Sequence, residues 1–324
     1  MANTQGSVVI TPEELSKSFH TYRKELIQMP VFSLQRALPA FTLRTGVRYK
    51  ETVGELSGDM QLRPYDPFAT DKNDVKIVGR TLETFLGSCV KEFDPNSVAK
   101  SIYGSNTVQG EALKNVPITA QVAAYMMKRL GDSLFRNLFT AKRKEEGTTS
   151  ADLFNGLKTI ADAEILAGNI SKEKGNFIEV DAITAENAED VFNEIYEAAD
   201  THLQDEETIL LCSGQNYRKY CKAYQTNHGS LPYNQSFDRP FIEGSNQMCR
   251  IVTLPNVPSD FLQISTKANC LIGVATSGAN VTFEVMKSLR SHFLVDFVAT
   301  MFIGCQYESI SKERLLVANC KSSV

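Results

Sequence analysis

Residues 117–140 constrain the fold of this chain more than any other stretch. Their sequence, PITAQVAAYMMKRLGDSLFRNLFT, repeats apolar side chains with the period of an α-helix and keeps polar side chains on the opposite face. Pro117 suits the first turn, where its missing N–H group leaves no hydrogen bond unmade. At about 1.5 Å per residue this helix would be roughly 35 Å long, about twice the usual length in globular proteins. We therefore expect a sheet or other helices to lie along its wide apolar face.

The chain before this helix predicts an arm and a hairpin rather than a domain. Residues 1–40 contain one short helix signal, Thr11-Pro12 followed by two acids, and are then interrupted by prolines. Residues 41–84 contain two strand candidates on either side of a long loop rich in Gly and Pro, which predicts an extended hairpin. An isolated two-stranded hairpin is marginally stable in water. We expect it to lie on another surface, for example on a second copy of the chain.

The chain after the helix changes to alternating helices and strands. Ser and Thr residues at helix-start positions, Ser213 among them, are expected to cap successive helices. Beyond Gly278 the strands lengthen: VTFEVMKSLRSHFLVDFVATMFIGCQY predicts two strands around a tight turn, and RLLVAN a further strand. We expect this sheet to lie along the long helix. Residues 85–149 and 277–324 would then form one domain, into which residues 150–276 are inserted.

Composition restricts the function mainly by exclusion. The net charge of −4 argues against a dedicated nucleic-acid binder, which usually has a basic excess. The seven cysteines lack C-x-x-C spacing and several lie in apolar runs, so we expect buried free thiols in a reducing compartment. No signal segment is visible at the start, and the apolar run near the end contains Asp296. We expect a soluble protein that is made in the cytoplasm and does not enter a membrane.

No set of residues with a catalytic spacing stands out. The segment GVATSGAN has the glycine spacing of a phosphate-binding loop, but Ala-Asn replaces the Lys-Ser/Thr that such a loop requires. A thiol–imidazole pair of His228 with Cys212 or Cys221 is the remaining catalytic candidate, and the apolar setting of both cysteines argues against it. We predict that the chain is not an enzyme and holds no catalytic residue, cofactor or metal ion.

The order of these elements resembles one known family, the HK97-fold major capsid proteins of tailed double-stranded DNA bacteriophages. TSADLFNGLKTIADAEI is similar to the Asn-Gly-Leu segment that opens the axial domain of that family. QMCRIVTLPNVPSDFLQISTKANCLIGV and FEVMKSLRSHFLVDFVATMFIGCQY are similar to its paired axial strands and its closing peripheral strands. The resemblance spans essentially the whole chain and implies an α+β, HK97-like capsid fold. Its parts would be an N-terminal arm at 1–40, an extended β-hairpin loop at 41–84, a peripheral domain with spine helix 117–140, and an inserted axial domain at 150–276.

The resemblance implies that the chain is a structural protein of the virion, made in the host cell cytoplasm. Identical subunits would form pentamers and hexamers that close an icosahedral head around double-stranded DNA, held without sequence specificity. Further implied partners are portal and scaffolding proteins, with a decoration protein as an additional candidate. The hairpin would reach over a neighbouring subunit, where its basic side chains would meet an acidic surface. The candidates for this contact are Arg44, Arg48, Lys50, Lys72, Lys76 and Arg80.

Two other interpretations remain open. An encapsulin-like nanocompartment shell protein shares this fold but packages an enzyme in place of DNA, so a copurifying cargo protein would distinguish it. A cytoplasmic α/β enzyme is the second alternative, based on the alternating helices and strands of residues 150–276. A tight monomer would favour the enzyme, because an enzyme does not need a projecting hairpin.

Overall fold

The computed structural model describes most of the chain from residue 30 onward. The described residues are 30, 33–57, 65, 76–94, 118–229, 240–275, 283–290 and 294–321. The predicted arm at 1–40 lies mostly outside them. None of the helices in these ranges is long and apolar enough to cross a membrane.

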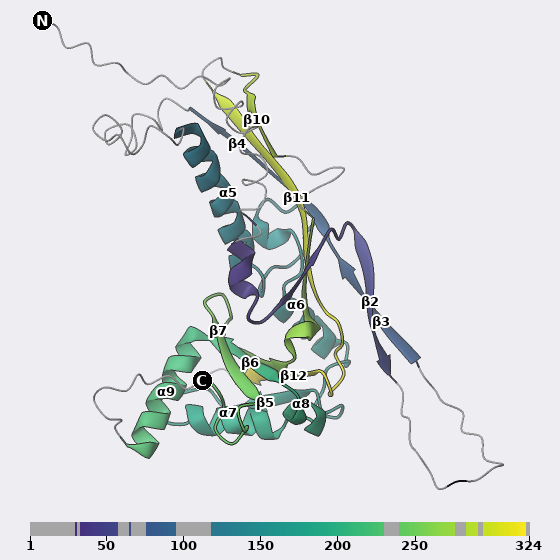
Figure 1. The fold of residues 1–324 in the computed structure, drawn as a ribbon, viewed down its shortest axis with the longest axis vertical. Helices are drawn as coiled ribbons and strands as arrows, with labels where there is room; N and C mark the ends of the chain where they lie inside the picture. The colour runs from purple at the N-terminus through teal and green to yellow at the C-terminus, as the bar shows by residue number, and fades with distance from the viewer. Residues whose placement is uncertain are drawn as a thin grey trace, which may run out of the picture.

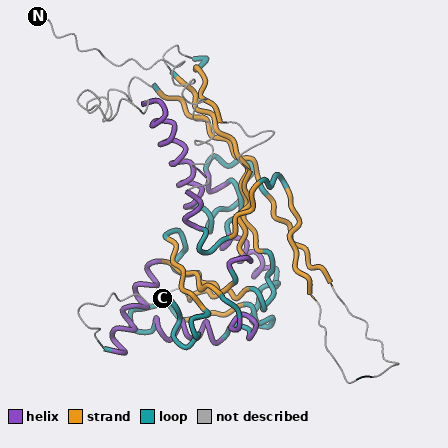
Figure 2. Tube along the Cα trace, in the orientation of Figure 1, coloured by secondary structure: helices purple, strands orange, loops and turns teal. Residues whose placement is uncertain are grey.

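The described elements form an elongated half and a compact half, with a two-stranded hairpin projecting beside them (Figure 1). In the elongated half, long strands run side by side with one long helix (Figure 2). The compact half contains shorter strands with several helices packed against them.

The elongated half is built on five strands, called the long sheet below. Four strands follow the order β1-β9-β11-β10. Strand β4 also pairs with β11, on the edge opposite to β10. The strands are β1 (Thr42–Thr45), β4 (Phe85–Phe93), β9 (Cys270–Ala275), β10 (Phe283–Lys287) and β11 (Val295–Tyr307). Strand β4 runs antiparallel to β11 over nine residue pairs, from Phe93 opposite Val295 to Phe85 opposite Ile303.

Strand β11 shows how the two faces of the long sheet differ. From Val295 to Thr300 buried and half-buried side chains alternate, as in a strand covered on one face only. From Met301 to Cys305 every residue is buried. The second face is therefore covered only along this later part. The cover is the base of the projecting hairpin, residues 47–53 and 82–84, which is called the root below.

The long helix predicted at 117–140 is α5 (Ile118–Arg136), with Met127 and Leu134 buried toward the long sheet. It ends before the predicted Thr140 because the chain turns at Asn137, whose side-chain amide donates to the Ser133 carbonyl oxygen at 2.8 Å. The apolar spacing nevertheless continues through the turn, so that Leu138 and Phe139 are buried in the same core.

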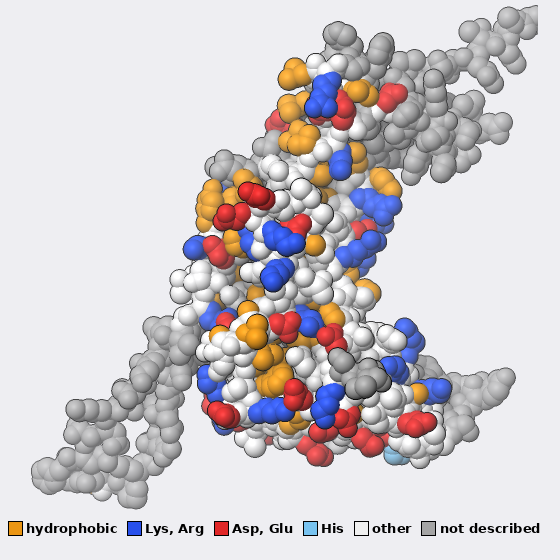
Figure 3. Space-filling view, turned by 180° about the vertical axis from the view of Figure 1, so that it is seen from behind, with side chains coloured by type: hydrophobic (Ala, Val, Ile, Leu, Met, Phe, Trp, Pro, Cys, Tyr) orange, Lys and Arg blue, Asp and Glu red, His pale blue; other side chains and the backbone are white. Residues whose placement is uncertain are grey.

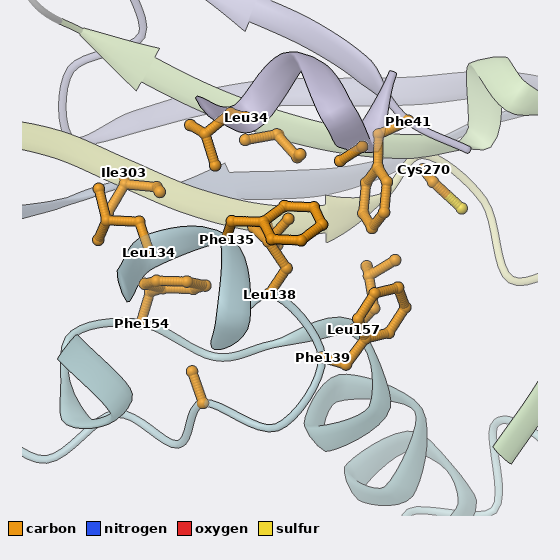
Figure 4. Packing of buried hydrophobic residues seen from close by; sticks show 14 of the residues in the cluster. Leu34, Phe41, Leu134, Phe135, Leu138, Phe139, Phe154, Leu157, Cys270 and Ile303 are labelled. Carbon is orange, nitrogen blue, oxygen red and sulfur yellow. The ribbon is translucent and has the colours of Figure 1, made fainter. Parts of the chain in front are cut away.

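The centre of the core lies where this turn meets the long sheet (Figure 4). Phe139 packs edge to face on Phe41, with ring centroids 5.6 Å apart. Burying one such large apolar side chain contributes about 1.5–3 kcal/mol. The residues that converge here are all less than a tenth exposed; they include Leu34, Phe41, Leu134, Phe135, Leu138, Phe139, Phe154, Leu157 and Ile303.

The compact half contains a second five-stranded sheet, called the compact sheet, with the order β5-β12-β8-β6-β7. Ser213 caps α9 as predicted, since its hydroxyl accepts a hydrogen bond from the Asn216 N–H group at 3.1 Å. The strands are β5 (Phe177–Val180), β6 (Thr208–Ser213), β7 (Cys249–Leu254), β8 (Phe261–Ser265) and β12 (Leu315–Cys320). The helices of this region are α6 (Leu157–Leu166), α7 (Ala188–Glu197), α8 (Thr201–Asp205) and α9 (Gly214–His228).

One face of the compact sheet belongs to the same core as the long sheet, and the other face packs on α7 and α9. A buried polar contact links the two sheets: the Tyr307 hydroxyl of β11 donates to Oε1 of Gln263 on β8 at 2.7 Å. Because Tyr307 is buried, its pKa lies well above the ordinary value of a phenol. The hydroxyl therefore stays protonated and remains a donor.

Two strands lie in a different sheet from the one that the predicted boundaries implied. Strand β9 falls within 150–276 but pairs with β1 and β11 of the long sheet. Strand β12 falls within 277–324 but lies between β5 and β8 of the compact sheet. The reason is burial: Leu315 to Ala318 are buried on both faces, and a central position in the compact sheet provides a core on each side.

The first predicted strand of the hairpin is also divided in two. Thr42–Thr45 form β1, which pairs in parallel with β9 and belongs to the long sheet. The chain then changes direction at Gly46 and Tyr49, which have φ angles of 83° and 66°. Such left-handed backbone ends a strand, because neighbouring residues can no longer continue one pleated ladder. The hairpin therefore starts at Lys50 rather than at residue 41.

The cysteines are free thiols, as predicted, and four of the seven are buried. Burial raises the pKa of Cys249 to about 12 and that of Cys270 to about 11. These thiols therefore stay protonated and act as small apolar side chains within the two cores.

Candidate assembly surface

The feature that stands apart from the body is the hairpin of β2 (Lys50–Ser57) and β3 (Lys76–Glu83). The two strands are antiparallel and in register from Lys50 opposite Glu83 to Ser57 opposite Lys76. They leave the body at its side and extend away from both sheets (Figure 1, Figure 2). The body therefore contacts the root of the hairpin, and the two strands run away from it.

The root lies on the long sheet at two glycines. This contact area between the root and the sheet is called the seat. Gly273 of β9 and Gly304 of β11 are directly opposite each other in the long sheet. A Cβ atom at Gly304 would overlap the carbonyl oxygen of Glu83, and one at Gly273 would lie 2.9 Å from the Thr84 side chain. Only glycine at these positions lets the backbone of the root cross the sheet at van der Waals distance.

Apolar and polar contacts complete the seat. Val47, Val53, Leu82 and Leu271 form a small buried cluster of their own between the root and β9. The N–H group of Thr84 donates to the carbonyl oxygen of Tyr49 at 2.7 Å, which closes the base of the hairpin. The same segment thereby covers the later part of β11, where every residue is buried.

Arg80 of β3 fixes the hairpin to the body. Its guanidinium donates to Glu164 of α6 at 2.6 Å and to Oε1 of Gln306 of β11 at 3.2 Å. Gln306 in turn donates through Nε2 to the carbonyl oxygen of Thr81 at 3.1 Å. The side chains of Arg80 and Glu164 are only 15% and 19% exposed, so water screens this ion pair less than a surface pair.

The environment of Glu164 favours its charged form. Burial acts against ionisation, but hydrogen bonds from Asn169 and Arg80, together with the charge of Arg80, lower the pKa of this carboxyl below its ordinary value. The ion pair is therefore complete at neutral pH. Its contribution to stability is present above the ordinary pKa of 4.5 and is lost as the pH falls through the lowered folded-state pKa.

We predict that Arg80→Met loosens the hairpin without unfolding the body. Removing one partner leaves Glu164 short of a charge-assisted hydrogen bond, which costs about 1.5–3 kcal/mol. Amide hydrogen exchange of β2 and β3 should accelerate about tenfold or more, while β11 exchanges at an unchanged rate. Lowering the pH from 7 to below 4 should accelerate hairpin exchange in the wild type more than in the variant, after correction for intrinsic exchange.

The matched control is Lys50→Met on the same hairpin, because Lys50 pairs with Glu83 at 3.1 Å through side chains 67% and 44% exposed. An exposed pair of this kind contributes little. Equal hairpin exchange in the two variants would contradict a fixing role for Arg80.

The structure places the six predicted contact residues in different settings. Arg80 is bound within its own chain, Lys50 pairs with Glu83 across the hairpin, and Arg44 of β1 lies 4.0 Å from Glu308. Arg48 is exposed at the turn into the hairpin. Lys76 is the first residue of β3, and Lys72 lies outside the described residues.

Sequence reasoning missed the residues that position the hairpin: Gly273, Gly304, Gln306 and Glu164. The two glycines did carry a signal, since each interrupts an apolar strand where a side chain would be expected. Glu164 and Gln306 carried none, because their partner Arg80 is distant in sequence.

The remaining catalytic candidate is not assembled. Nε2 of His228 lies 2.8 Å from Oε1 of Glu189, and the imidazole stacks on Tyr224, so the ring is held by α7 and by its own helix. Among the residues that the structure describes, no three His, Cys, Asp or Glu side chains are grouped so as to hold a metal ion.

Comparison with known proteins identifies the fold. No protein-family model and no curated protein sequence matches the chain. One similar structure is the satellite phage P4 procapsid, which was solved together with the size determination (Sid) protein. A chain of it superposes with a TM-score of 0.57 at 12% identity, and the match covers 93% of this chain and 99% of that one. The capsid of an empty GTA particle gives 0.55 at 9% identity, covering 89% and 90%.

A chain from Mycobacterium phage Adephagia is similar as well, with a TM-score of 0.52 at 13% identity, covering 89% of this chain and 91% of that one. At such identities the agreement concerns the fold. The chain has a mixed α+β fold that matches the HK97-like capsid structures.

Proposed function

We propose that this protein is a major capsid protein, whose copies assemble into pentamers and hexamers and close an icosahedral shell around double-stranded DNA. The observation that supports this most is the extent of the structural similarity, which covers 93% of this chain and 99% of a chain of the P4 procapsid. A fold can carry many functions. A hairpin that projects from the body of its own chain is a second observation in favour of assembly.

In this proposal each part of the chain has a structural role. The long sheet with α5 serves as the peripheral domain and the compact sheet with its helices serves as the axial domain. The hairpin serves as the extended loop that reaches over a neighbouring subunit, where Lys50, Lys76 and Arg48 are candidates for contact. Portal, scaffolding and decoration proteins are further candidate partners.

The surface charge is compatible with a shell that holds DNA by enclosure. Acidic and basic side chains are interspersed over the face of the molecule seen from behind, without a continuous basic field (Figure 3). The net charge of −4 agrees with this picture. A protein that gripped DNA directly would need a basic stripe to neutralise phosphates.

The test is the particle size of the purified, untagged chain, measured by light scattering and negative-stain microscopy. We expect rings of five or six subunits, tubes or closed shells, either from the chain alone or on coexpression with the candidate scaffolding proteins of the same genome. A uniform 36.0 kDa monomer under all these conditions would contradict the proposal.

The contents of the particles separate the proposal from its closest alternative. Shells that enclose DNA would support a phage capsid, whereas shells that copurify with one enzyme would identify a nanocompartment. A tight monomer that binds a small ligand would favour the enzyme interpretation instead.

A further inference from the structure

A groove runs beside α5, on the side where strand β4 and the loop that follows α5 approach the helix. It has a volume of about 910 Å³ and lies between α5, strands β4 and β11, and the loop of residues 143–153. Along α5 its lining extends from Tyr125 to Leu134. At about 1.5 Å per residue this length is roughly 14 Å, which corresponds to between two and three helical turns.

The floor of the groove is apolar. Gly87 of β4 faces the Leu153 side chain, and a Cβ atom at Gly87 would lie 2.6 Å from Leu153 Cδ2, so the strand is as close to the loop as glycine allows. An apolar floor with a polar edge is typical of sites that take the apolar face of a helix. The floor residues include Met126, Leu130, Leu134, Leu153, Phe297, Ala299 and Met301.

The rim has an excess of positive charge. Lys91, Arg129, Arg143 and Lys144 line the groove, against the carboxylates of Glu145 and Asp152. One of these carboxylates is already neutralised, since Lys144 Nζ lies 3.4 Å from Asp152.

The other cations of the rim are available to a partner. Arg143 lies over the ring of Phe85 at 4.5 Å, and Arg129 donates to the Tyr125 hydroxyl at 2.9 Å. Neither contact neutralises a guanidinium charge. Lys91 makes no ion pair with any residue that the structure describes.

The charge of the rim selects among possible occupants. The two hairpin strands of a second copy carry three bases and three acids, so they offer the rim no net complement. Residues 1–29 of the chain contain three acids and three bases, so they offer no net complement. Nucleic acid would bring phosphates next to Glu145 and bases onto an aliphatic floor, where little aromatic surface is present for stacking.

We propose that this groove binds an acidic amphipathic helix of a separate protein. Apolar side chains of that helix, spaced at i, i+3, i+4 and i+7, lie on the floor, and its carboxylates face Lys91 and Arg129. The assignment goes beyond the proposed shell function and does not depend on it, because the groove belongs to a single subunit.

The test measures binding of a synthetic peptide to the full-length chain by fluorescence anisotropy, using the smallest species isolated by gel filtration. The probe is a labelled amphipathic peptide of about five helical turns, with leucine on one face and glutamate on the other. Two control peptides have the same composition in scrambled order, or lysine in place of glutamate. We expect the Leu/Glu helix to bind at least about tenfold more tightly than either control, and more weakly as salt is raised.

Variants locate the binding. Arg129→Glu should weaken binding of the Leu/Glu peptide about tenfold, whereas Lys128→Glu should change it less than about twofold. Lys128 is exposed on the same helix but does not line the groove, so it is a matched control for charge and helix stability.

Three results would overturn the proposal. The first is equal binding of the ordered and scrambled peptides. The second is an equal effect of the two charge reversals. The third is tighter binding, sensitive to Arg129→Glu, of a single-stranded DNA oligonucleotide or of a synthetic peptide of residues 1–29, which would assign the groove to nucleic acid or to the chain's own arm. Since binding is measured on subunits, a failure here is separate from a failure to form shells.

Discussion

Replacing residues 58–75 by the dipeptide Asn-Gly will leave the body folded and abolish closed shells. Ser57 and Lys76 are directly opposite each other at the end of the described hairpin, so a two-residue turn connects them without changing the register. Asn-Gly suits this position, because a type I′ turn requires positive φ at both residues. The variant therefore keeps β2, β3 and the whole seat, and removes only the segment that connects the two strands.

The physical reason for the expected loss is reach. The contacts that fix the hairpin to the body lie near Arg80 and Glu83, and the variant keeps both. If the extended loop contacts a neighbouring subunit, those lost contacts recur at every interface of the shell. Small losses per contact then sum over a ring and block closure.

The measurement combines negative-stain microscopy with thermal unfolding of the variant. We expect an unchanged melting temperature and subunits or small oligomers in place of shells. A replacement of the same residues by a Gly/Ser segment of equal length separates reach from side-chain chemistry. Closed shells of normal size from the Asn-Gly variant would show that the hairpin tip does not contribute to assembly.

The second large effect is expected at the seat of the hairpin. Gly304→Ala places a Cβ atom where the carbonyl oxygen of Glu83 now lies, and that atom belongs to the backbone and cannot rotate away. Overpacking of this kind costs about 1–3 kcal/mol. The root must lift from β11, and the buried cluster around Leu82 opens with it.

Gly79→Ala is the matched control, since the same change on the hairpin itself places the Cβ atom 3.3 Å from the methyl group of Thr52, an exposed side chain rather than a backbone atom. We expect the control to change the free energy of unfolding by less than about 0.5 kcal/mol. Urea unfolding and hydrogen exchange of β2 and β3 measure the difference. Equal stability and equal hairpin protection in the two variants would show that the close crossing at Gly304 is not required.

The two proposals make separate claims on the surface of the subunit. The hairpin would contact other copies of the chain, whereas the groove beside α5 would bind a different protein through opposite charge. A variant at Arg129 should therefore leave the contacts between copies intact, and the hairpin deletion should leave peptide binding at the groove unchanged.

Several parts of the fold follow from the sequence alone because they depend on neighbouring residues. The period of 3.6 residues marks α5, Ser213 caps α9 through an N–H group three residues away, and an alternating pattern marks the start of β11. The existence of a hairpin between residues 41 and 84 could also be predicted, although its first strand begins later than expected.

Tertiary structure alone decided how these elements combine. Whether β9 and β12 join the long or the compact sheet depends on which strands offer free edges and buried faces, and those strands lie far away in the chain. The same holds for Arg80 and Glu164, whose meeting depends on where α6 packs. Local pattern specifies an element because its hydrogen bonds and side-chain spacing are set within a few residues. Strand pairing, the seat of the hairpin and the groove beside α5 arise only when distant segments share one core.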